Sequence, residues 1–202
     1  MQLLQHELNG RVYAAYPIPE EALSPYEERA LRLGVSRGVL PVAFTGGEGR
    51  LHMLFDCEET ELLTGYFRRE RGRWDSQGDR LLGFGMRIVR GLLDAEEHFL
   101  PLAFFTLTEE TVRIRPRDEA VFLLPDPGRE RTDSGVLRLR SELADYLGAL
   151  GTGLSDRSWN GYRERLLYEI REGRGGLSAL YGTLERARGE LYRRAAGENA
   201  AL

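Results

Sequence analysis

Apolar and polar positions alternate in two runs of the first 57 residues, where Val42, Phe44, Leu51, Met53 and Phe55 take every second position, which is the pattern of half-buried β-strands. The runs LLQHEL and RVYAAYPIP flank Asn9-Gly10, a dipeptide that favours a tight hairpin because both residues tolerate positive φ. A second pair of runs, GVLPVAFT and RLHMLFD, flanks the turn GGEG. Between the pairs, Ser24–Glu27 (SPYE) predicts a capped helix that ends at Gly34. The predicted order is strand, strand, helix, strand, strand.

Residues 58–195 show mainly the spacing of amphipathic helices. The predicted helices cover about 61–71, 80–98, 137–150, 159–171 and 177–192. The second of these has apolar residues on a wide face, so we expect it to be central and buried. Two strand-like runs, TVRIR and AVFLL, predict a hairpin at about 111–124, and residues 196–202 are expected to be a frayed tail.

These patterns predict an α+β protein with two lobes. The N-terminal β-sheet lobe, residues 1–57, contains one helix, and the acidic segment Asp56–Glu59 serves as a hinge. The helical C-terminal lobe, residues 58–195, contains the short β-hairpin. A chain of 202 residues is long enough to bury a substantial core in this arrangement.

Composition and charge restrict the function classes. The chain is 42% hydrophobic and 30% charged, with a net charge of -4, so we expect a globular protein with no general attraction to nucleic acid. No apolar run approaches the ~20 residues of a membrane span, and the start MQLLQHELNGR lacks the features of a signal peptide. The single Cys57 cannot form an internal disulfide, which favours a cytoplasmic location.

All 28 basic residues are arginine, and the sequence contains no lysine. Mechanisms that need a lysine amine are therefore excluded, including Schiff bases, Walker A loops and the lysine that anchors ATP in protein kinases.

Neither glycine cluster has the context of a phosphate-binding loop. Gly83-Phe84-Gly85 falls within a helical pattern, where close packing of a neighbouring helix is the better interpretation. Thr45–Gly49 is a hairpin turn in which Glu48 would repel phosphate.

Metal ligands and reactive thiols are also not indicated. His6, His52 and His98 fall on separate elements without the spacing of metal ligands. Acidic neighbours of Cys57 should raise the pKa of its thiol. We therefore predict no catalytic residues, no cofactor and no metal.

One surface cluster is a candidate for binding a partner. It comprises Arg68, Arg69, Arg71, Arg73 and Trp74, and we call it the arginine cluster. Arginine suits bidentate contacts to carboxylates or phosphates. The alternative is a solvated helix end, where cations complement the helix dipole. Apolar stripes over 162–170 and 177–191 are expected to pack in the core, with a groove or a homodimer face as the alternative.

The order of elements resembles a small protein kinase. In more detail, the chain is similar to a bacterial domain family of unknown function that precedes forkhead-associated (FHA) domains. That family is related to the pseudokinase domain of YukC/EssB, a type VII secretion subunit. The resemblance spans about residues 3–190 and is carried by hydrophobic patterns. The matching stretches are VYAAYPIPEE, the helix Leu23–Leu33, GVLPVAFTGGEGRLHMLFDCEETELLTGYF, the long helix, TVRI with AVFLLP, and LRSELADYL with the helices after it.

The resemblance carries over no catalytic residue. The connector Phe99–Leu107 contains no Asp, Asn or Lys, so it lacks the base and the amide of a kinase catalytic loop. Glu27 or Glu28 could imitate the kinase helix glutamate but would have no lysine to pair with. Asp126-Pro127-Gly128 is similar to the metal-binding Asp-Phe-Gly, yet it is also ordinary turn chemistry.

The resemblance implies a small protein-kinase-like (pseudokinase) fold without enzymatic activity. We expect a scaffold or docking module that binds protein partners in a bacterial membrane-associated assembly of the secretion or pilus type. It would lie in the cytoplasm, at the inner face of the membrane. The 202 residues include no FHA domain, so we expect a stand-alone copy or a fragment of a longer protein.

Three alternatives remain open at this stage. The kinase-like cleft could hold a nucleotide, as a sensor or a weak enzyme. Nucleic acid or an acidic partner could bind through Arg68–Arg73. The third is an unrelated α/β domain whose order of elements imitates a kinase.

Overall fold

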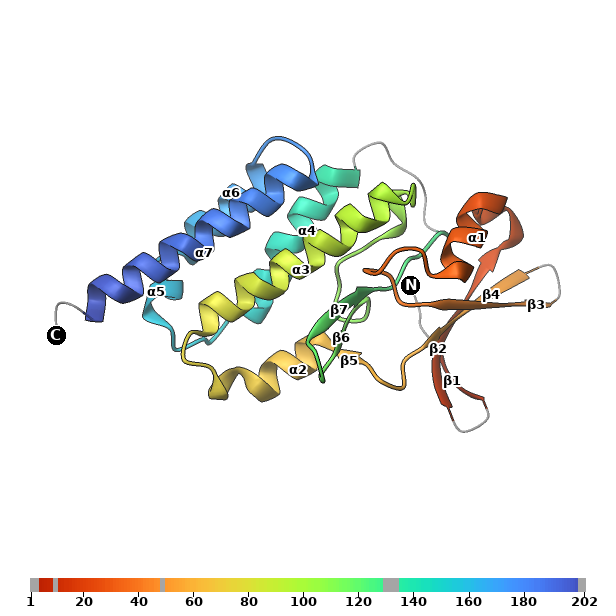
Figure 1. Cartoon of the computed structure of the whole chain (residues 1–202), viewed down its shortest axis with the longest axis horizontal. Helices are drawn as coiled ribbons and strands as arrows, with labels where there is room; N and C mark the ends of the chain where they lie inside the picture. The colour runs from red at the N-terminus through yellow and green to blue at the C-terminus, as the bar shows by residue number, and fades with distance from the viewer. Residues whose placement is uncertain (1–3, 9–10, 48–49, 129–134, 200–202) are drawn as a thin grey trace.

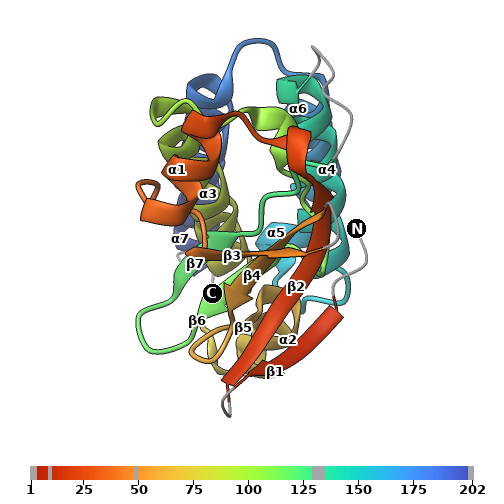
Figure 2. The same cartoon turned by 90° about the vertical axis from the view of Figure 1, so that its right-hand side faces the viewer.

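The computed structural model of the protein describes residues 4–8, 11–47, 50–128 and 135–199. Two parts follow one another along the long axis of the molecule (Figure 1). One is a four-stranded sheet with a helix, and the other is a helical body that contains a three-stranded sheet. Figure 2 looks onto the first part, with its strands and helix in front of the helical body.

The first part is an antiparallel sheet with the strand order β1-β2-β4-β3. Its strands are β1 (Leu4–Leu8), β2 (Arg11–Pro19), β3 (Val42–Gly47) and β4 (Arg50–Asp56). Alternation along β2 and β4 buries Tyr16, Ile18, Met53 and Phe55 on one face, as the sequence pattern predicts. The expected turn residues Asn9, Gly10, Glu48 and Gly49 lie outside the described residues.

Helix α1 (Pro25–Leu33) begins and ends as predicted. The Ser24 hydroxyl accepts a hydrogen bond from the backbone N–H of Glu27 at 3.3 Å, and the Glu27 carboxylate accepts one from the Ser24 N–H at 2.7 Å. Gly34 then turns the chain with φ 59°, a left-handed conformation that glycine adopts without steric cost.

The second part is organised around one long helix. Its helices are α2 (Leu63–Glu70), α3 (Gln77–Glu97), α4 (Gly135–Leu150), α5 (Arg157–Asn160), α6 (Arg163–Glu172) and α7 (Leu177–Asn199). Short 3-10 helices cover Glu20–Ala22 (η1), Arg71–Arg73 (η2) and Leu102–Phe104 (η3). Helix α3 is central, as predicted, and α7 runs beside it (Figure 1).

The hairpin of the second part lies where the sequence pattern placed it, with strands β6 (Val112–Arg115) and β7 (Ala120–Leu123). A third strand, β5 (Glu61–Leu62), pairs with β6. The prediction that the helix begins at residue 61 was therefore wrong, because residues 61 and 62 form a strand and the helix begins at Leu63. A strand of two residues is too short to show an alternating pattern in the sequence, and it forms only because a neighbouring strand pairs with it.

Two further predictions of helix boundaries were wrong. The helix expected over 159–171 is divided into α5 and α6 by Gly161, which disfavours helix, and the Asp156 carboxylate caps α5 by accepting from the Trp159 N–H. Helix α7 continues to Asn199, through part of the tail that was expected to be frayed. Residues 200–202 lie outside the described residues.

The loop between α1 and β3 joins the two parts. Leu40 N–H donates to the carbonyl of Leu123 at 3.2 Å, and Leu123 N–H donates to the carbonyl of Gly38 at 2.8 Å. The loop also reaches α3, where the Asp94 carboxylate accepts hydrogen bonds from the Ser36 hydroxyl at 2.6 Å and the Arg37 N–H at 2.7 Å. These contacts fix how the sheet sits on the helical body.

Candidate functional site

In a kinase-like fold the nucleotide would bind at the junction between the two parts. Strand β2 of the first part faces the segment Leu124–Gly128, which follows β7. The Tyr16 ring stacks on Phe55 with centroids 5.8 Å apart, and the two side chains are 4% and 0% exposed. A Cβ on Gly128 would lie 3.7 Å from the Ile18 side chain, so this segment packs directly under β2. Apolar side chains therefore fill this part of the junction.

Asp126 belongs to the same junction. Its backbone N–H donates to the Phe104 carbonyl at 2.6 Å, which fixes the segment against the connector. Burial raises the pKa of Tyr16 well above its usual value, and the nearby Asp126 carboxylate raises it further. The buried Tyr16 hydroxyl has no hydrogen-bond partner among the residues that the structure describes. The β2 residue near Asp126 is therefore a tyrosine whose hydroxyl stays protonated and uncharged.

The glutamates of α1 have roles within their own helix. Glu27 is buried, and its carboxylate closes the capping box. Glu28 forms an ion pair with Arg32 at 2.7 Å. The structure thus places both candidates for the kinase helix glutamate in contacts that support α1.

The connector Phe99–Leu107 packs into the core of the second part. Phe104 and Phe105 are fully buried, while Phe99 is 78% exposed and adopts φ 56°. The Thr106 carbonyl accepts from the Thr111 hydroxyl, and Leu107 N–H donates to Glu142. The connector therefore supports the hairpin through apolar side chains and backbone groups.

The two glycines of the Gly83-Phe84-Gly85 cluster have different surroundings. A Cβ on Gly85 would lie 3.1 Å from Leu147 of α4, which is the close helix packing that was predicted. Gly83 instead faces open space, and a Cβ on it would have nothing within 4 Å. Of the turn Thr45–Gly49, residues 45–47 continue β3 and the remainder lies outside the described residues.

The histidines and the cysteine do not assemble a reactive site. His6 lies on β1, His52 on β4 and His98 at the end of α3, and no group of metal ligands forms among the described residues. Burial is the largest cause of the raised pKa of Cys57, and Asp56 contributes less. The predicted direction of the shift agrees, but the predicted cause was secondary.

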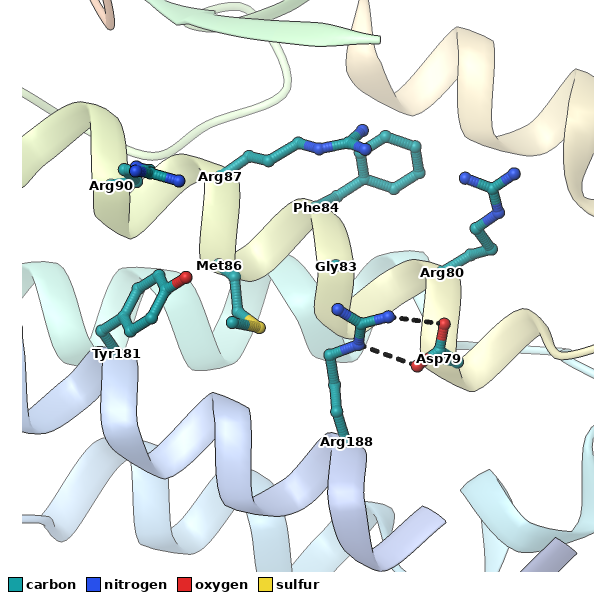
Figure 3. A pocket seen from close by; sticks show the side chains of 9 residues that line it. All are labelled: Asp79, Arg80, Gly83, Phe84, Met86, Arg87, Arg90, Tyr181 and Arg188. Carbon is teal, nitrogen blue, oxygen red and sulfur yellow. Dashed lines mark hydrogen bonds and ion pairs between the residues drawn. The ribbon is translucent and has the colours of Figure 1, made fainter. Parts of the chain in front are cut away.

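A pocket that was not predicted from the sequence lies between α3 and α7 (Figure 3). It has a volume of about 300 Å³. Arg80, Arg87 and Arg90 approach it from α3, and Tyr181 and Arg188 approach it from α7. A search of the sequence for basic clusters misses this site, because its arginines are spread over more than a hundred residues. A search for arginines at i, i+7 and i+10 along the predicted long helix would have found the three on α3.

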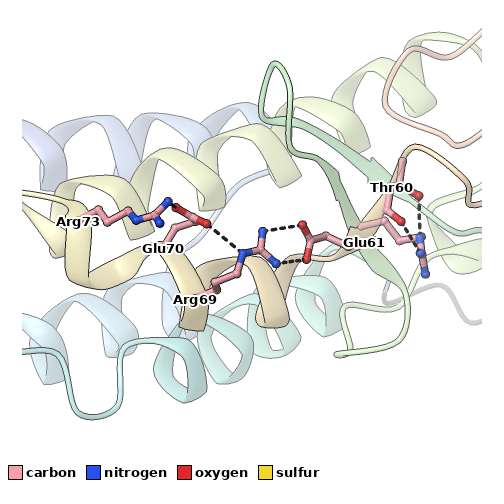
Figure 4. A network of polar contacts seen from close by, with 6 residues as sticks. Thr60, Glu61, Arg69, Glu70 and Arg73 are labelled. Atoms are coloured by element: carbon pink, nitrogen blue, oxygen red, sulfur yellow. Dashed lines mark hydrogen bonds and ion pairs between the residues drawn. The ribbon is translucent and has the colours of Figure 1, made fainter.

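The arginine cluster predicted from the sequence is largely compensated by nearby carboxylates (Figure 4). Arg69 makes two contacts of 2.7 Å with Glu61 and one of 2.9 Å with Glu70. Arg73 pairs with Glu70 at 2.8 Å, and Arg68 pairs with Glu109 at 3.1 Å.

The remaining two residues of the cluster point elsewhere. Arg71 donates to the Thr152 carbonyl at 3.5 Å. Trp74 packs against Phe67 with centroids 5.1 Å apart, next to Tyr66 and Phe84. Trp74 therefore covers the core. Binding of a partner by this cluster stays a prediction.

Comparison with known proteins gives a likeness at the level of the fold. No protein-family model and no curated protein matches the sequence. Among solved structures, the apo form of the pseudokinase GRMZM2G135359 matches with a TM-score of 0.53 and 12% identity. The match covers 93% of this chain and 87% of that chain.

At this identity the likeness concerns the fold alone. It agrees with the predicted α+β architecture, in which a small sheet with one helix precedes a helical part holding a hairpin. No helix among the described residues combines the length and the apolar character that crossing a membrane requires. The chain has a kinase-like fold similar to that of a pseudokinase.

Proposed function

We propose that this protein is a non-catalytic, kinase-like docking module. The observation that carries the proposal is that uncharged aromatic side chains occupy the junction. Buried Tyr16 and Phe55 lie there against the segment that holds Asp126. An active kinase places a lysine from its sheet on the phosphates of ATP and pairs it with a helix glutamate. This chain contains no lysine, and the β2 side chain beside Asp126 is a phenol.

Loss of several of these groups together argues against even weak phosphoryl transfer. Phosphoryl transfer depends almost entirely on positioned charges, because the protein contributes little covalent chemistry. The connector lacks a base and an amide, and Glu27 closes a capping box. Asp126 alone would have to hold metal and nucleotide.

The finer form of the proposal comes from the resemblance in sequence. It is a scaffold that binds protein partners in a bacterial assembly of the secretion or pilus type, at the cytoplasmic face of the membrane. A homodimer is compatible with this role. The exposed helical surface of the second part supplies the area for docking.

A thermal-shift experiment with ATP and Mg²⁺ tests the lack of nucleotide binding. A ligand present at about 100 times its Kd adds about 2.7 kcal/mol to the free energy of unfolding. In a chain of this size that is a rise of several degrees in the unfolding temperature. At millimolar ATP and Mg²⁺ we expect no rise in the unfolding temperature that requires the Asp126 carboxylate.

The variant Asp126→Asn makes the result specific to the junction. The second candidate function, a nucleotide sensor, is favoured only by the presence of Asp126 at the junction. A magnesium-dependent shift in the unsubstituted protein that disappears in Asp126→Asn would contradict our proposal and support the sensor.

A further inference from the structure

Two arginines of the pocket on α3, Arg80 and Arg87, are held in place by one acidic residue. The Glu119 carboxylate accepts hydrogen bonds from Arg80 at 3.0 Å, from Arg87 at 3.1 Å and from the Tyr66 hydroxyl at 3.0 Å. The Arg87 guanidinium also lies over the Phe84 ring, and that of Arg80 lies over the Trp74 ring. Both guanidiniums are therefore ordered before any ligand arrives.

These arginines keep donors for a ligand. Arg80 and Arg87 each use one terminal nitrogen on Glu119, and a guanidinium carries five N–H donors. Their side chains are 44% and 41% exposed. The remaining donors are accessible from solvent.

Positive charge exceeds negative charge in the pocket. Arg188 is paired with Asp79 through two contacts of 2.8 Å. Arg90 is exposed and forms no ion pair or hydrogen bond with any residue that the structure describes. Four arginines thus line the pocket with one carboxylate, Asp79, and the neighbouring Glu119 contacts two of them, on a chain whose net charge is -4.

The pocket continues into a second hollow. Arg87 and Arg90 also line a cavity of about 580 Å³ between α3 and the β6–β7 hairpin, which reaches Arg37 and Asp94. The two hollows share Arg87 and Arg90 and follow one another along α3 from Asp79 to Asp94, a length of about 22 Å at 1.5 Å per helical residue. An extended peptide of about seven residues would span it. We call this the α3 groove.

We propose that the α3 groove docks an extended acidic segment of a partner protein, whose carboxylates contact Arg90, Arg87 and Arg80. The inference rests on the proposed docking function and names the partner's chemistry. Charge complementarity favours it at the end of the groove that holds Arg80, Arg87 and Arg90, because arginine binds carboxylates through paired N–H donors. In the second hollow the carboxylates outnumber the arginines, so the acidic residues of the partner would lie at the Arg80–Arg90 end. A nucleic acid carries a phosphate at every unit and would meet Glu97 and Asp118 in the second hollow. A peptide can place neutral or basic side chains there.

Gly83 gives a substitution that tests the groove without disturbing the core. It lines the pocket, and a Cβ added to it meets nothing within 4 Å. Gly83→Glu adds a carboxylate inside the pocket, and Gly83→Ala is its matched control. Arg90→Glu reverses the unpaired charge. Arg73→Glu, at a residue of the arginine cluster that is 77% exposed, controls for a general change in net charge.

The measurement is fluorescence polarisation of a fluorescein-labelled seven-residue peptide, with three glutamates followed by four serines, at low and at raised ionic strength. Circular dichroism confirms that each variant is folded. We expect binding that weakens with salt. Gly83→Glu and Arg90→Glu should weaken it about tenfold or more, because each adds a repulsive carboxylate at the contact. Gly83→Ala and Arg73→Glu should stay within about twofold of the unsubstituted protein.

Several outcomes would overturn the inference. Absence of peptide binding at low salt is one, and an equal loss in Arg73→Glu is another. Binding of phosphatidylglycerol-containing vesicles or of single-stranded DNA in place of the peptide, with the same dependence on Arg90, would assign the groove to those ligands. A rise in unfolding temperature with ATP that depends on Asp126 would contradict the proposed function and leave this inference standing. A rise that depends on Arg90 would assign the α3 groove to a nucleotide and overturn this inference alone.

Discussion

Tyr16 and Tyr66 are tyrosines in similar apolar surroundings with different hydroxyl environments. Tyr16 is 4% exposed, and its hydroxyl has no partner among the described residues. Tyr66 donates to Glu119 at 3.0 Å, and burial together with that contact raises the pKa of Tyr66 to about 12. A buried hydroxyl without a partner costs free energy that a hydrogen-bonded one does not. The sequence pattern identifies both as core residues and does not separate them.

Replacing each tyrosine by phenylalanine should therefore have opposite effects. Tyr16→Phe removes an unsatisfied group, so we expect the free energy of unfolding to stay unchanged or rise by up to about 1 kcal/mol. Tyr66→Phe removes a donor from a carboxylate and should lower it by about 1–2 kcal/mol. Urea unfolding followed by circular dichroism measures both. A clear loss in Tyr16→Phe would mean that its hydroxyl has a partner at the junction, and a bound ligand would then be the first explanation.

The contact between the α1–β3 loop and α3 depends on two glycines. A Cβ on Gly38 would overlap the Cα of Gly91, so the loop can approach the helix only without a side chain there. This approach brings Ser36 and Arg37 to Asp94, and Gly38 and Leu40 to Leu123. The glycine at position 38 therefore sets the distance between two elements.

Gly38→Ala should lower the free energy of unfolding by about 1–3 kcal/mol, since backbone on both sides must move to admit the methyl group. Gly65→Ala is the matched control. Gly65 is exposed in α2, nothing lies within 4 Å of an added Cβ, and alanine there should stabilise the helix by about 0.5–1 kcal/mol. Thermal and urea unfolding of the two variants test the contrast. Equal effects in both would contradict the close approach.

At the scale of the whole molecule, Asp94 is the acidic residue that ties the sheet to the helical body. Burial raises the pKa of Asp94, but hydrogen bonds from the Ser36 hydroxyl and from the Arg37 and Gly38 N–H groups outweigh it. The resulting pKa is below the usual value. A carboxyl whose pKa is lower in the folded state contributes stability that is present above its unfolded pKa, about 3.9, and lost as pH falls through the folded pKa.

Asp94→Asn should therefore weaken the protein in a pH-dependent way. At pH 7 we expect a loss of about 1–3 kcal/mol, because the carboxylate accepts two short hydrogen bonds from the loop. The difference between the two proteins should shrink as pH falls below about 4. Glu97→Gln, on an exposed position of the same helix, is the control and should show little difference. Unfolding curves at a series of pH values measure this, and a difference that persists unchanged at low pH would contradict it.

Most elements could be predicted because their signals are local. The α1 capping box and its terminal Gly34, the strand alternation and the apolar face of α3 each depend on residues within a few positions of one another. Strand β5 was missed because only its pairing with β6 makes it a strand. The break between α5 and α6 was missed because apolar spacing continues across Gly161.

The sequence by itself determined that this protein cannot use a lysine amine, that its connector lacks catalytic acids and amides, and where most of its helices and strands lie. Tertiary structure alone decided which arginines have carboxylate partners. It neutralised Arg68, Arg69 and Arg73 with Glu61, Glu70 and Glu109, and it gathered Arg80, Arg87, Arg90 and Arg188 around one pocket. The physical reason is the separation along the sequence between the residues that interact. Capping and periodicity act between residues a few positions apart, whereas ion pairs and grooves depend on which helices pack together.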